Sequence, residues 1–410
     1  MSYAFLASLP ACAPDDLNDS AVTAFEGAFL ITGNDDEVIE DATFLVDGDR
    51  ITQVGTSEEV DVSRAEVRVD LRGRTVMPAL VNTHIHLPSS RDSLVQELCL
   101  NARQGVGTVV SLGEDFGDVP FQVRRESIPG TARYLTAGRG ITGSEPGWSD
   151  VPYWVSTVEE ARNAVIELAD PKVDIVKIWV DDGGGSYRKL ASELYSVIIN
   201  EAHQRGLRVT AHIFYLEDAK QLMLAGIDAF AHGVRDQAVD DELLSLLNTH
   251  PDVVYVPNLP EPVVDRDWDW LRGSVSSDEL ERLQNVQRDS VTARARFALQ
   301  AQNLARVNSA GARIGFGTDG YVAWNAHFEL EDMVLAGMSP ADVIVAATRN
   351  SAQLLRLDDV GTIAPGMSAD FMVLEANPLE DITHTRKIEA VYLRGVLVDP
   401  SREGGACRES

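Results

Sequence analysis

Lysine and positive charge are scarce in this chain of 410 residues. Only five of its 35 basic residues are lysines, whereas 64 residues are acidic, and the formal net charge is −29. Nucleic acids and anionic membrane surfaces bind to basic patches, so this balance argues against both as partners. We therefore expect a small-molecule substrate and no nucleic acid, within a homo-oligomeric assembly. The position of each lysine becomes informative.

Cysteine is also rare, and long apolar runs are absent. Cys12, Cys99 and Cys407 show no CxxC spacing, so neither a disulfide framework nor a cysteine zinc site is indicated. No apolar run reaches the roughly 18 residues of a spanning helix. The segment "YAFLASLPAC" resembles the end of a bacterial lipoprotein signal, although no positively charged region precedes it. We expect residues 1–23 to be a signal remnant and flexible tether. A lipidated Cys12 implies a periplasmic or membrane-anchored protein, and an unmodified one a cytoplasmic protein.

Segments at the two ends of the chain share a texture of short strands and tight turns. Near the start, "TFLV" and "RITQV" flank an Asp-Gly pair, which is typical of a β-hairpin. Near the end, "ADFMVLE" precedes "KIEAVYLRGVLVD", which has a turn at its Arg-Gly pair. We predict that residues 24–78 and 358–402 together form a small β-sandwich domain.

Residues 79–357 alternate short apolar segments with amphipathic helical stretches. The strand-like segments are "VMPALVNTHIH", "GTVVSLG", "ARYLTAGRG", "VDIVKIWV", "LRVTAHI", "IDAFAHG", "DVVYVPNL" and "ARIGFGTD". One helical stretch, "TVEEARNAVIELAD", has capping-box spacing between Thr157 and Glu160. Eight strands with helical crossovers pair in parallel, which predicts an α/β fold, a (β/α)8 TIM barrel. An open doubly wound sheet is the alternative, but no GxGxxG follows the first strand.

Polar residues fall at or near the ends of these strands, where a TIM barrel carries its chemistry. They are His84, His86, Lys177, His212, His232 and Asp319. His84 and His86 share one face of a strand, and two convergent imidazoles suit a zinc-like ion. Taken alone, a histidine here can equally be a hydrogen-bonded core residue, and Asp319 a turn residue. Convergence of the whole set on one rim favours a metal site. Three histidines on predicted outer elements are taken as structural, namely His203, His250 and His384.

Lys177 lies inside an apolar strand segment, "VDIVKIWV". A lysine there loses solvation, which lowers its pKa and leaves a neutral, nucleophilic amine. Such an amine can capture carbon dioxide as an anionic carbamate, N6-carboxylysine, which is able to bridge two cations. A snorkelling lysine or a simple ion pair is the alternative. The histidines on the same rim favour the carbamate.

These motifs together resemble the amidohydrolase superfamily. The series is "HIH", "VKIWV", "TAHI", "FAHG" and "GFGTD", with "MPALVNTHIH" before it and "GTIAPGMSADFMVLE" after it. The resemblance covers residues 24 to 400 approximately, and it is strongest to the binuclear branch with a carboxylated lysine, which includes imidazolonepropionase-like proteins and Xaa-Pro dipeptidases. It implies that His84, His86 and Asp319 hold one divalent metal ion and that His212 and His232 hold the other, with carboxylated Lys177 bridging both. Zinc is the default metal, and manganese or cobalt suits the same ligands.

The resemblance also implies a reaction. A hydroxide held between the two metals attacks a carbonyl, and Asp319 transfers its proton to the leaving group. The expected enzyme is a metal-dependent amidohydrolase of C–N amide bonds in dipeptides or N-acyl amino acids. An esterase, lactonase or phosphotriesterase on the same centre is the alternative. A deaminase is disfavoured, because such relatives usually keep one metal and lack the lysine. A non-catalytic binding protein would have lost some of the ligands.

Substrate selection in this fold belongs to the loops that follow the strands. After the third strand, Trp148, Tyr153 and Trp154 offer an aromatic wall. The candidate partners for a substrate carboxylate are Tyr215, Arg139 and Arg235. In dipeptidase-like relatives a tyrosine follows the strand-five histidine closely, whereas here Tyr215 lies three residues after His212.

Overall fold

A computed structural model describes residues 21–35, 37–144, 149–260, 262, 266–285 and 291–398. Cys12 and Trp148 lie outside these ranges, so the predicted lipid anchor and the predicted role of Trp148 concern residues that are not described. Within the described part of the chain, no helix combines the length and the apolar character that crossing a bilayer requires. The homo-oligomeric assembly stays a prediction.

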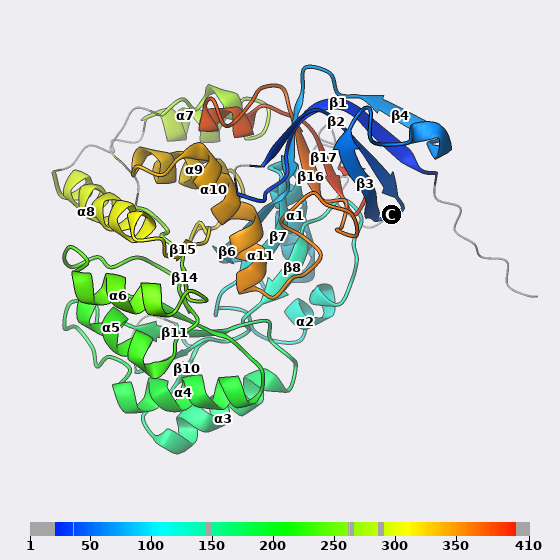
Figure 1. Cartoon of the computed structure of the whole chain (residues 1–410). Coiled ribbons are helices and arrows are strands. Elements are labelled where there is room, and N and C mark those ends of the chain that lie inside the picture. The colour runs from blue at the N-terminus through cyan, green and yellow to red at the C-terminus, as the bar shows by residue number, and fades with distance from the viewer. Residues whose placement is uncertain are drawn as a thin grey trace, which may run out of the picture.

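Both ends of the chain contribute strands to one mixed sheet. Its strands are β1 (Thr23–Ile31), β2 (Val38–Asp47), β3 (Arg50–Thr56), β4 (Val67–Asp70), β5 (Thr75–Pro78), β16 (Phe371–Leu374), β17 (Ile388–Leu393) and β18 (Val396–Val398). The order is β18-β17-β16-β5-β1-β2-β3, with β4 beside β1, and Figure 1 shows the blue and orange strands at one end of the molecule. The two predicted hairpins are confirmed, with positive φ at Gly48, Arg394 and Gly395 in their turns. The division of the sheet into two packed layers stays a prediction.

A cluster of aromatic side chains from this sheet joins strands of the two ends of the chain. The Phe25 ring stacks on Phe44 at 4.9 Å and meets the edge of Phe371 at 5.1 Å. Phe371 in turn stacks on Tyr392 at 4.8 Å. Because offset and edge-to-face ring pairs are favourable beyond the area that they bury, this cluster stabilises the pairing of segments that are far apart in sequence.

The middle of the chain forms parallel strands. They are β6 (Leu80–Ile85), β7 (Val106–Ser111), β8 (Arg133–Thr136), β9 (Ile141–Thr142), β10 (Tyr153–Trp154), β11 (Val176–Val180), β12 (Val209–Ile213), β13 (Ala229–Phe230), β14 (Val254–Tyr255) and β15 (Arg313–Ile314). Pairing gives one sheet of β6-β7-β8 and another of β10-β9-β11-β12-β13-β14-β15. Main-chain hydrogen bonds also span the gaps between them, for example from Thr83 N to Phe316 O and from Asp174 N to Thr136 O, both 2.9 Å. Each of the eight predicted segments carries a strand, and the fold is a mixed α/β fold.

Helices connect and cover the parallel strands. They are α1 (Arg91–Arg103), α2 (Val119–Arg124), α3 (Val158–Ala169), α4 (Ser192–Gln204), α5 (Leu216–Ala225), α6 (Asp241–Thr249), α7 (Ser277–Asn285), α8 (Val291–Ser309), α9 (Asn325–Leu335), α10 (Pro340–Val345) and α11 (Ser351–Leu354). Short 3-10 helices η1 (Val62–Arg64), η2 (Asp269–Leu271) and η4 (Ile382–Arg386) and one π-helical turn, η3 (Ala346–Asn350), complete the set. The capping box of Thr157 and Glu160 is present at the start of α3. Figure 1 shows α3 to α6 around β11, away from the mixed sheet.

Cys99, on the buried side of α1, is disulfide-bonded. Neither the number nor the spacing of the cysteines indicated this bond. Cys12 and Cys407 both lie outside the described residues.

Candidate metal centre

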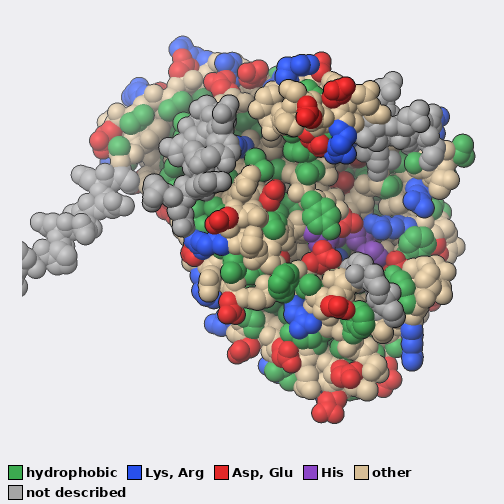
Figure 2. Space-filling model, turned by 180° about the vertical axis from the view of Figure 1, so that it is seen from behind, with side chains coloured by type: hydrophobic (Ala, Val, Ile, Leu, Met, Phe, Trp, Pro, Cys, Tyr) green, Lys and Arg blue, Asp and Glu red, His purple; other side chains and the backbone are tan. Residues whose placement is uncertain are grey.

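The side chains singled out by the sequence meet at one end of the parallel strands. His84 is in β6, Lys177 in β11 and His212 in β12, while His86, His232 and Asp319 follow β6, β13 and β15. The imidazole centroids of His232 lie 4.9 Å from His84 and 4.5 Å from His212, and His84 lies 5.3 Å from His86. Figure 2 shows histidine side chains (purple) in a hollow of the surface, with acidic side chains (red) in front of them. His203, His250 and His384 lie on α4, at the end of α6 and in η4.

Asp319 reaches the cluster because the segment after β15 is held against β6. The His84 carbonyl accepts hydrogen bonds from the amides of Thr318 and Asp319, both at 2.9 Å. Gly317 permits this approach, since a Cβ there would lie 2.7 Å from His84 Cβ. Asp319 itself has a φ of +48°, a left-handed conformation that aspartate tolerates better than most residues. The backbone therefore turns the carboxylate toward the histidines.

The Asp319 carboxylate faces three imidazoles. Its Oδ1 lies 3.1 Å from His84 Nε2 and 3.2 Å from His86 Nε2, and its Oδ2 lies 3.4 Å from His232 Nδ1. Burial opposes the negative charge, but attraction to the protonated forms of His232 and His84 outweighs it, and the pKa of the Asp319 carboxyl lies well below its ordinary value. Asp319 is therefore ionised at neutral pH.

Hydrogen bonds fix which nitrogen of two imidazoles carries a proton. His84 Nδ1 lies 3.0 Å from Ala231 O and 3.1 Å from Asn258 Oδ1. A carbonyl oxygen only accepts, so Nδ1 donates and Nε2 turns a lone pair toward Asp319. His212 Nε2 likewise donates to Asp181 Oδ2 at 3.1 Å, which leaves its Nδ1 as the lone-pair atom. Metal-ligating histidines are held in this way, with the far nitrogen bonded to a carbonyl or carboxylate.

Several buried nitrogens of the centre have no hydrogen-bond partner among the described residues. They are His84 Nε2, His86 Nδ1, His232 Nδ1 and Lys177 Nζ. His86 Nδ1 does lie 3.3 Å from Glu114 Oε2, without hydrogen-bond geometry. Burial lowers the pKa of His84 and of His212 to about 4, and that of His232 well below its ordinary value, so these rings are neutral at pH 7. One ligand atom each from His84, His232 and Asp319 lies within 4.8 Å of the others. Neutral imidazoles beside a carboxylate are a donor set that fits a divalent cation.

Lys177 is fully buried on β11, on the same face as Trp179. Its Nζ lies 5.2 Å from the Trp179 ring centroid. Burial lowers the pKa of Lys177 to about 7, an effect that Asp319 opposes and Arg235 reinforces. A substantial fraction of this lysine is therefore a neutral amine at pH 7, as the sequence predicted from its apolar neighbours.

The predicted substrate contacts have different surroundings. Tyr215 donates from its hydroxyl to Asp182 Oδ1 at 2.7 Å, and this bond raises the pKa of Tyr215 to about 12. The Arg139 guanidinium lies 4.0 Å from the Tyr153 ring centroid and donates to main-chain carbonyls of the same loop. Burial lowers the pKa of Arg235, whose charge interacts with Asp319 and Asp181. Arg235 is thus the predicted contact that the structure brings to the centre.

Sequence reasoning missed the groups that hold the histidines. Asp181 ends the segment of Lys177, Glu114 follows β7, and Asn258 follows β14 with a φ of +43°. Asp181 directly follows β11, and Glu114 and Asn258 lie three residues after the ends of β7 and β14; a polar residue near a strand end is the signal that identified the histidines themselves. Asp and Glu are common in this acidic chain, so position alone did not single these residues out.

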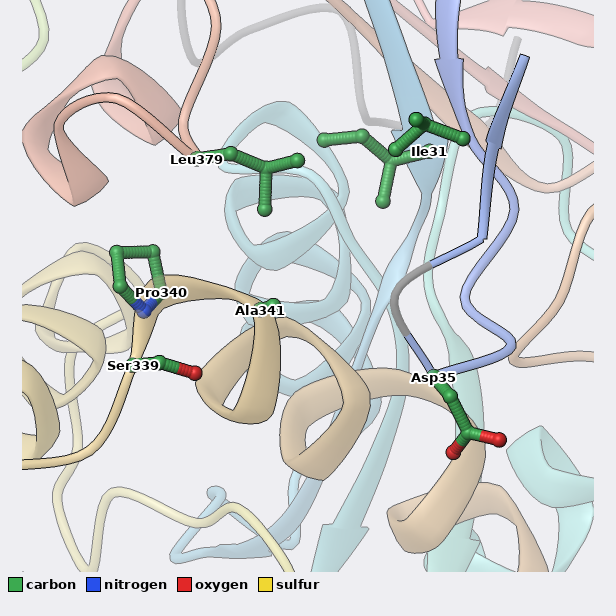
Figure 3. A pocket seen from close by; sticks show the side chains of 7 residues that line it. Ile31, Asp35, Ser339, Pro340, Ala341 and Leu379 are labelled. Atoms are coloured by element: carbon green, nitrogen blue, oxygen red, sulfur yellow. The ribbon is translucent and has the colours of Figure 1, made fainter.

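A cavity of about 390 Å³ lies elsewhere, between the mixed sheet and α10. Figure 3 shows Ile31 and Asp35 on one side of it and Ser339, Pro340 and Ala341 on the other. None of the clustered histidines lines this cavity. This cavity is therefore separate from the histidine cluster.

Comparisons with known proteins identify the family of the chain. The model of the amidohydrolase family matches residues 156–398, and the chain belongs to this family. An imidazolonepropionase of Streptomyces avermitilis is 24% identical over 377 residues, covering 83% of this chain and 82% of the relative. An ochratoxinase of Aspergillus niger is 24% identical over 440 residues, covering 91% and 85%. The crystal structure of a Xaa-Pro dipeptidase with bound methionine superposes with a TM-score of 0.74 at 23% identity, covering 92% of this chain and 99% of that one.

Family membership confirms the predicted class of enzyme. The protein is a hydrolase that acts on carbon–nitrogen bonds of small molecules.

Proposed function

We propose that this protein is a metal-dependent amidohydrolase that cleaves the C–N amide bond of dipeptides or N-acyl amino acids. The observation that carries the proposal is the convergence of buried, neutral imidazoles and an ionised carboxylate at one set of strand ends. Residues 79–357 would form the closed (β/α)8 barrel around this centre, with residues 24–78 and 358–402 as the separate β-domain.

The proposed ligands divide into two groups. His84, His86 and Asp319 would hold one divalent ion, and His212 and His232 the other, with carboxylated Lys177 between them. The unpartnered nitrogens of His84, His86, His232 and Lys177 support this assignment. A buried polar atom without a partner is costly, and a cation removes that cost. Bound zinc ions would supply Lewis-acid polarisation of the scissile carbonyl and a more acidic water.

The chain's own groups then perform two proton-related tasks. The neutral Lys177 amine adds to carbon dioxide, forming an N–C bond and releasing one proton, and the product is an anion. Ionised Asp319 accepts a proton from the attacking water at a carboxylate oxygen and delivers it to the leaving nitrogen. The leaving amine departs neutral, and the carboxylate is regenerated.

The substrate class rests on the relatives and on charge. A Xaa-Pro dipeptidase shares the fold, and an imidazolonepropionase and an ochratoxinase are each 24% identical to this chain over most of its length. A dipeptide or N-acyl amino acid carries a carboxylate, and Arg235 is a half-buried cation whose charge interacts with Asp319 and that can pair with such a carboxylate. Tyr215, Arg139 and Trp148 remain predicted contacts.

The test measures metal content and turnover on the same samples. Protein reconstituted with zinc is assayed against dipeptides and N-acyl amino acids, with matched esters and lactones alongside. We expect about two ions per chain and release of amino acid from the amide panel. Chelated protein restored with zinc is the control. A protein that takes up no metal, or that turns over only the esters and lactones, contradicts the proposal.

A further inference from the structure

Aromatic side chains are unevenly placed on the surface of the described chain. The large hydrophobic side chains that are strongly exposed include three aromatic ones, Phe116, Trp154 and Tyr321. Phe116 follows β7 and Tyr321 follows β15, whereas Trp154 lies in β10. Scattered exposed aliphatic residues are ordinary, but exposed aromatic rings on loops that carry a candidate site are able to contact a ligand.

Tyr321 lies at the edge of the metal centre. It follows Asp319 by two residues and is 66% exposed. Its ring centroid is 5.6 Å from that of His86, with the two planes inclined by 36°. The ring therefore stands beside a proposed metal ligand with most of its surface open to solvent.

Phe116 lies in the loop after β7, which also carries Glu114. It is 58% exposed and follows Glu114, whose Oε2 lies 3.3 Å from His86 Nδ1. The Phe116 amide donates to Ser89 Oγ at 3.3 Å, which holds the β7 loop against the segment after His86. Phe116 and Tyr321 thus belong to two loops that both contact the surroundings of His86.

Trp179 provides an inner wall next to Lys177. Its ring occupies space that two glycines leave open, since a Cβ at Gly140 would lie 1.9 Å and one at Gly113 2.4 Å from ring atoms. Gly113 immediately precedes Glu114, so the Trp179 ring packs against the start of the loop that carries Phe116. The glycines make room for an indole beside the reactive lysine.

We propose that Trp179, Phe116 and Tyr321 form a subsite for a bulky apolar group of the substrate, preferably an aromatic ring. This inference deepens the proposed function and rests on it for the identity of the substrate. An aromatic side chain buries 150–250 Å² and gains from offset stacking on other rings. The aromatic wall predicted after the third strand stays a prediction, and Tyr153 of that wall packs on Arg139.

The experiment compares two hydroxamic acids that share a metal-binding head. 3-Phenylpropionohydroxamic acid carries an aromatic ring and acetohydroxamic acid only a methyl group. Their dissociation constants for zinc-reconstituted protein are measured by calorimetry, for the wild type and for F116A, Y321A and Y321F. L224A, on the outer surface of α5 where Leu224 is 68% exposed, is the matched control.

We expect the wild type to prefer the aromatic hydroxamate by about tenfold or more. F116A and Y321A should each reduce the preference at least threefold, whereas Y321F and L224A should keep it. Equal binding of the two compounds by the wild type, including binding of neither, overturns the subsite. A preference that survives in both alanine variants overturns it as well. Amide turnover is measured in parallel to distinguish the subsite from the proposed function. An enzyme that hydrolyses amides but shows no preference contradicts the subsite alone. A protein that shows the preference but hydrolyses no amide contradicts only the proposed function.

Discussion

Two buried cations in this molecule have opposite surroundings. Lys177 is buried at the metal centre, and its Nζ has no hydrogen-bond partner among the described residues. Arg266, before η2, has a side chain only 4% exposed, yet its Nη2 bonds both carboxylate oxygens of Asp332 at 2.6 and 2.8 Å. Its guanidinium also lies 4.3 Å from the Phe328 ring centroid. One cation is fully paired, and the other is not.

The presence or absence of a partner distinguishes a buried cation that stabilises the fold from one that is available for chemistry. A buried charge that is paired and hydrogen-bonded fixes the elements that carry it, here α9 and the segment before η2. A buried lysine without a partner loses its proton instead, and a neutral amine is reactive. Pairing therefore predicts a loss of stability on mutation at Arg266 and Asp332, whereas the unpaired Lys177 predicts a loss of activity.

The largest expected effect is on catalysis. K177A should lose bound metal and lower kcat/KM by about a thousandfold, since a preorganised charge at the centre disappears. Added short carboxylic acids should restore part of the activity by replacing the carbamate. K189A, which removes a lysine paired with Asp218 at 2.7 Å, is the control and should keep its metal. Full activity of K177A would remove the carbamate from the mechanism.

The paired cation should show the reverse pattern. D332A removes the carboxylate that bonds Arg266 Nη2 and leaves the longer contact of Arg266 Nη1 with Glu331 at 3.9 Å, and we expect it to lower the free energy of unfolding by about 3 kcal/mol. Urea denaturation measures the change, and the metal content of the folded variant should match the wild type. The double variant R266M/D332L removes both charges and should recover much of the loss. If D332A lost metal but kept its stability, the proposed contrast between a stabilising pair at Arg266 and a catalytic residue at Lys177 would be wrong.

The carboxylate behind His212 offers a smaller, more selective effect. D181A removes the acceptor of the His212 Nε2 proton, and we expect zinc affinity to fall by about 10–100-fold. D182A, at the next residue, removes the acceptor of the Tyr215 hydroxyl and should leave zinc affinity unchanged. Competition with a chromogenic chelator gives both values. Equal losses in the two variants would show that general loop disorder, and not the orientation of His212, is being measured.

The smallest expected effect concerns His327, a buried residue of α9, the helix that also carries Asp332. Burial, reinforced by Arg386, lowers the pKa of His327 to about 3. Between that value and the unfolded value of about 6.5, the unfolded chain binds the extra proton, so stability falls as the pH falls through this window. For metal-free protein between pH 6 and 4, H327Q should reduce the slope of unfolding free energy by about 1.4 kcal/mol per pH unit. An unchanged slope would mean that His327 is protonated in the fold.

Much of the architecture could be predicted because local patterns and long-range structure agree. Every predicted parallel segment carries a strand, and the turn at Gly48 and the capping box at Thr157 formed where short-range chemistry placed them. The ligand candidates could be identified because histidine and lysine are scarce in this chain, so several of them at strand ends stand out. Single-sequence patterns do not contain the pairing of sheet layers, which depends on how distant strands twist and pack.

The supporting groups were harder to predict. Asp181 and Glu114 resemble many surface acids until their partners His212 and His86 are placed beside them. Asn258 depends on a left-handed backbone and on the approach of β6, neither of which a motif records. Trp179 was read as part of an apolar strand, and its ring packs where Gly113 and Gly140, in the segments after β7 and β8, leave space.

The mixed sheet can be completed around β5 only late in protein synthesis. β5 pairs with β1 on one side and with β16 on the other, although β16 is translated only after all the parallel strands. Until then the nascent chain carries a strand with one open edge, and open edges recruit other chains. We therefore expect a chain that ends before Phe371 to be prone to aggregation. The last part of the sequence supplies the strand that covers the open edge of β5.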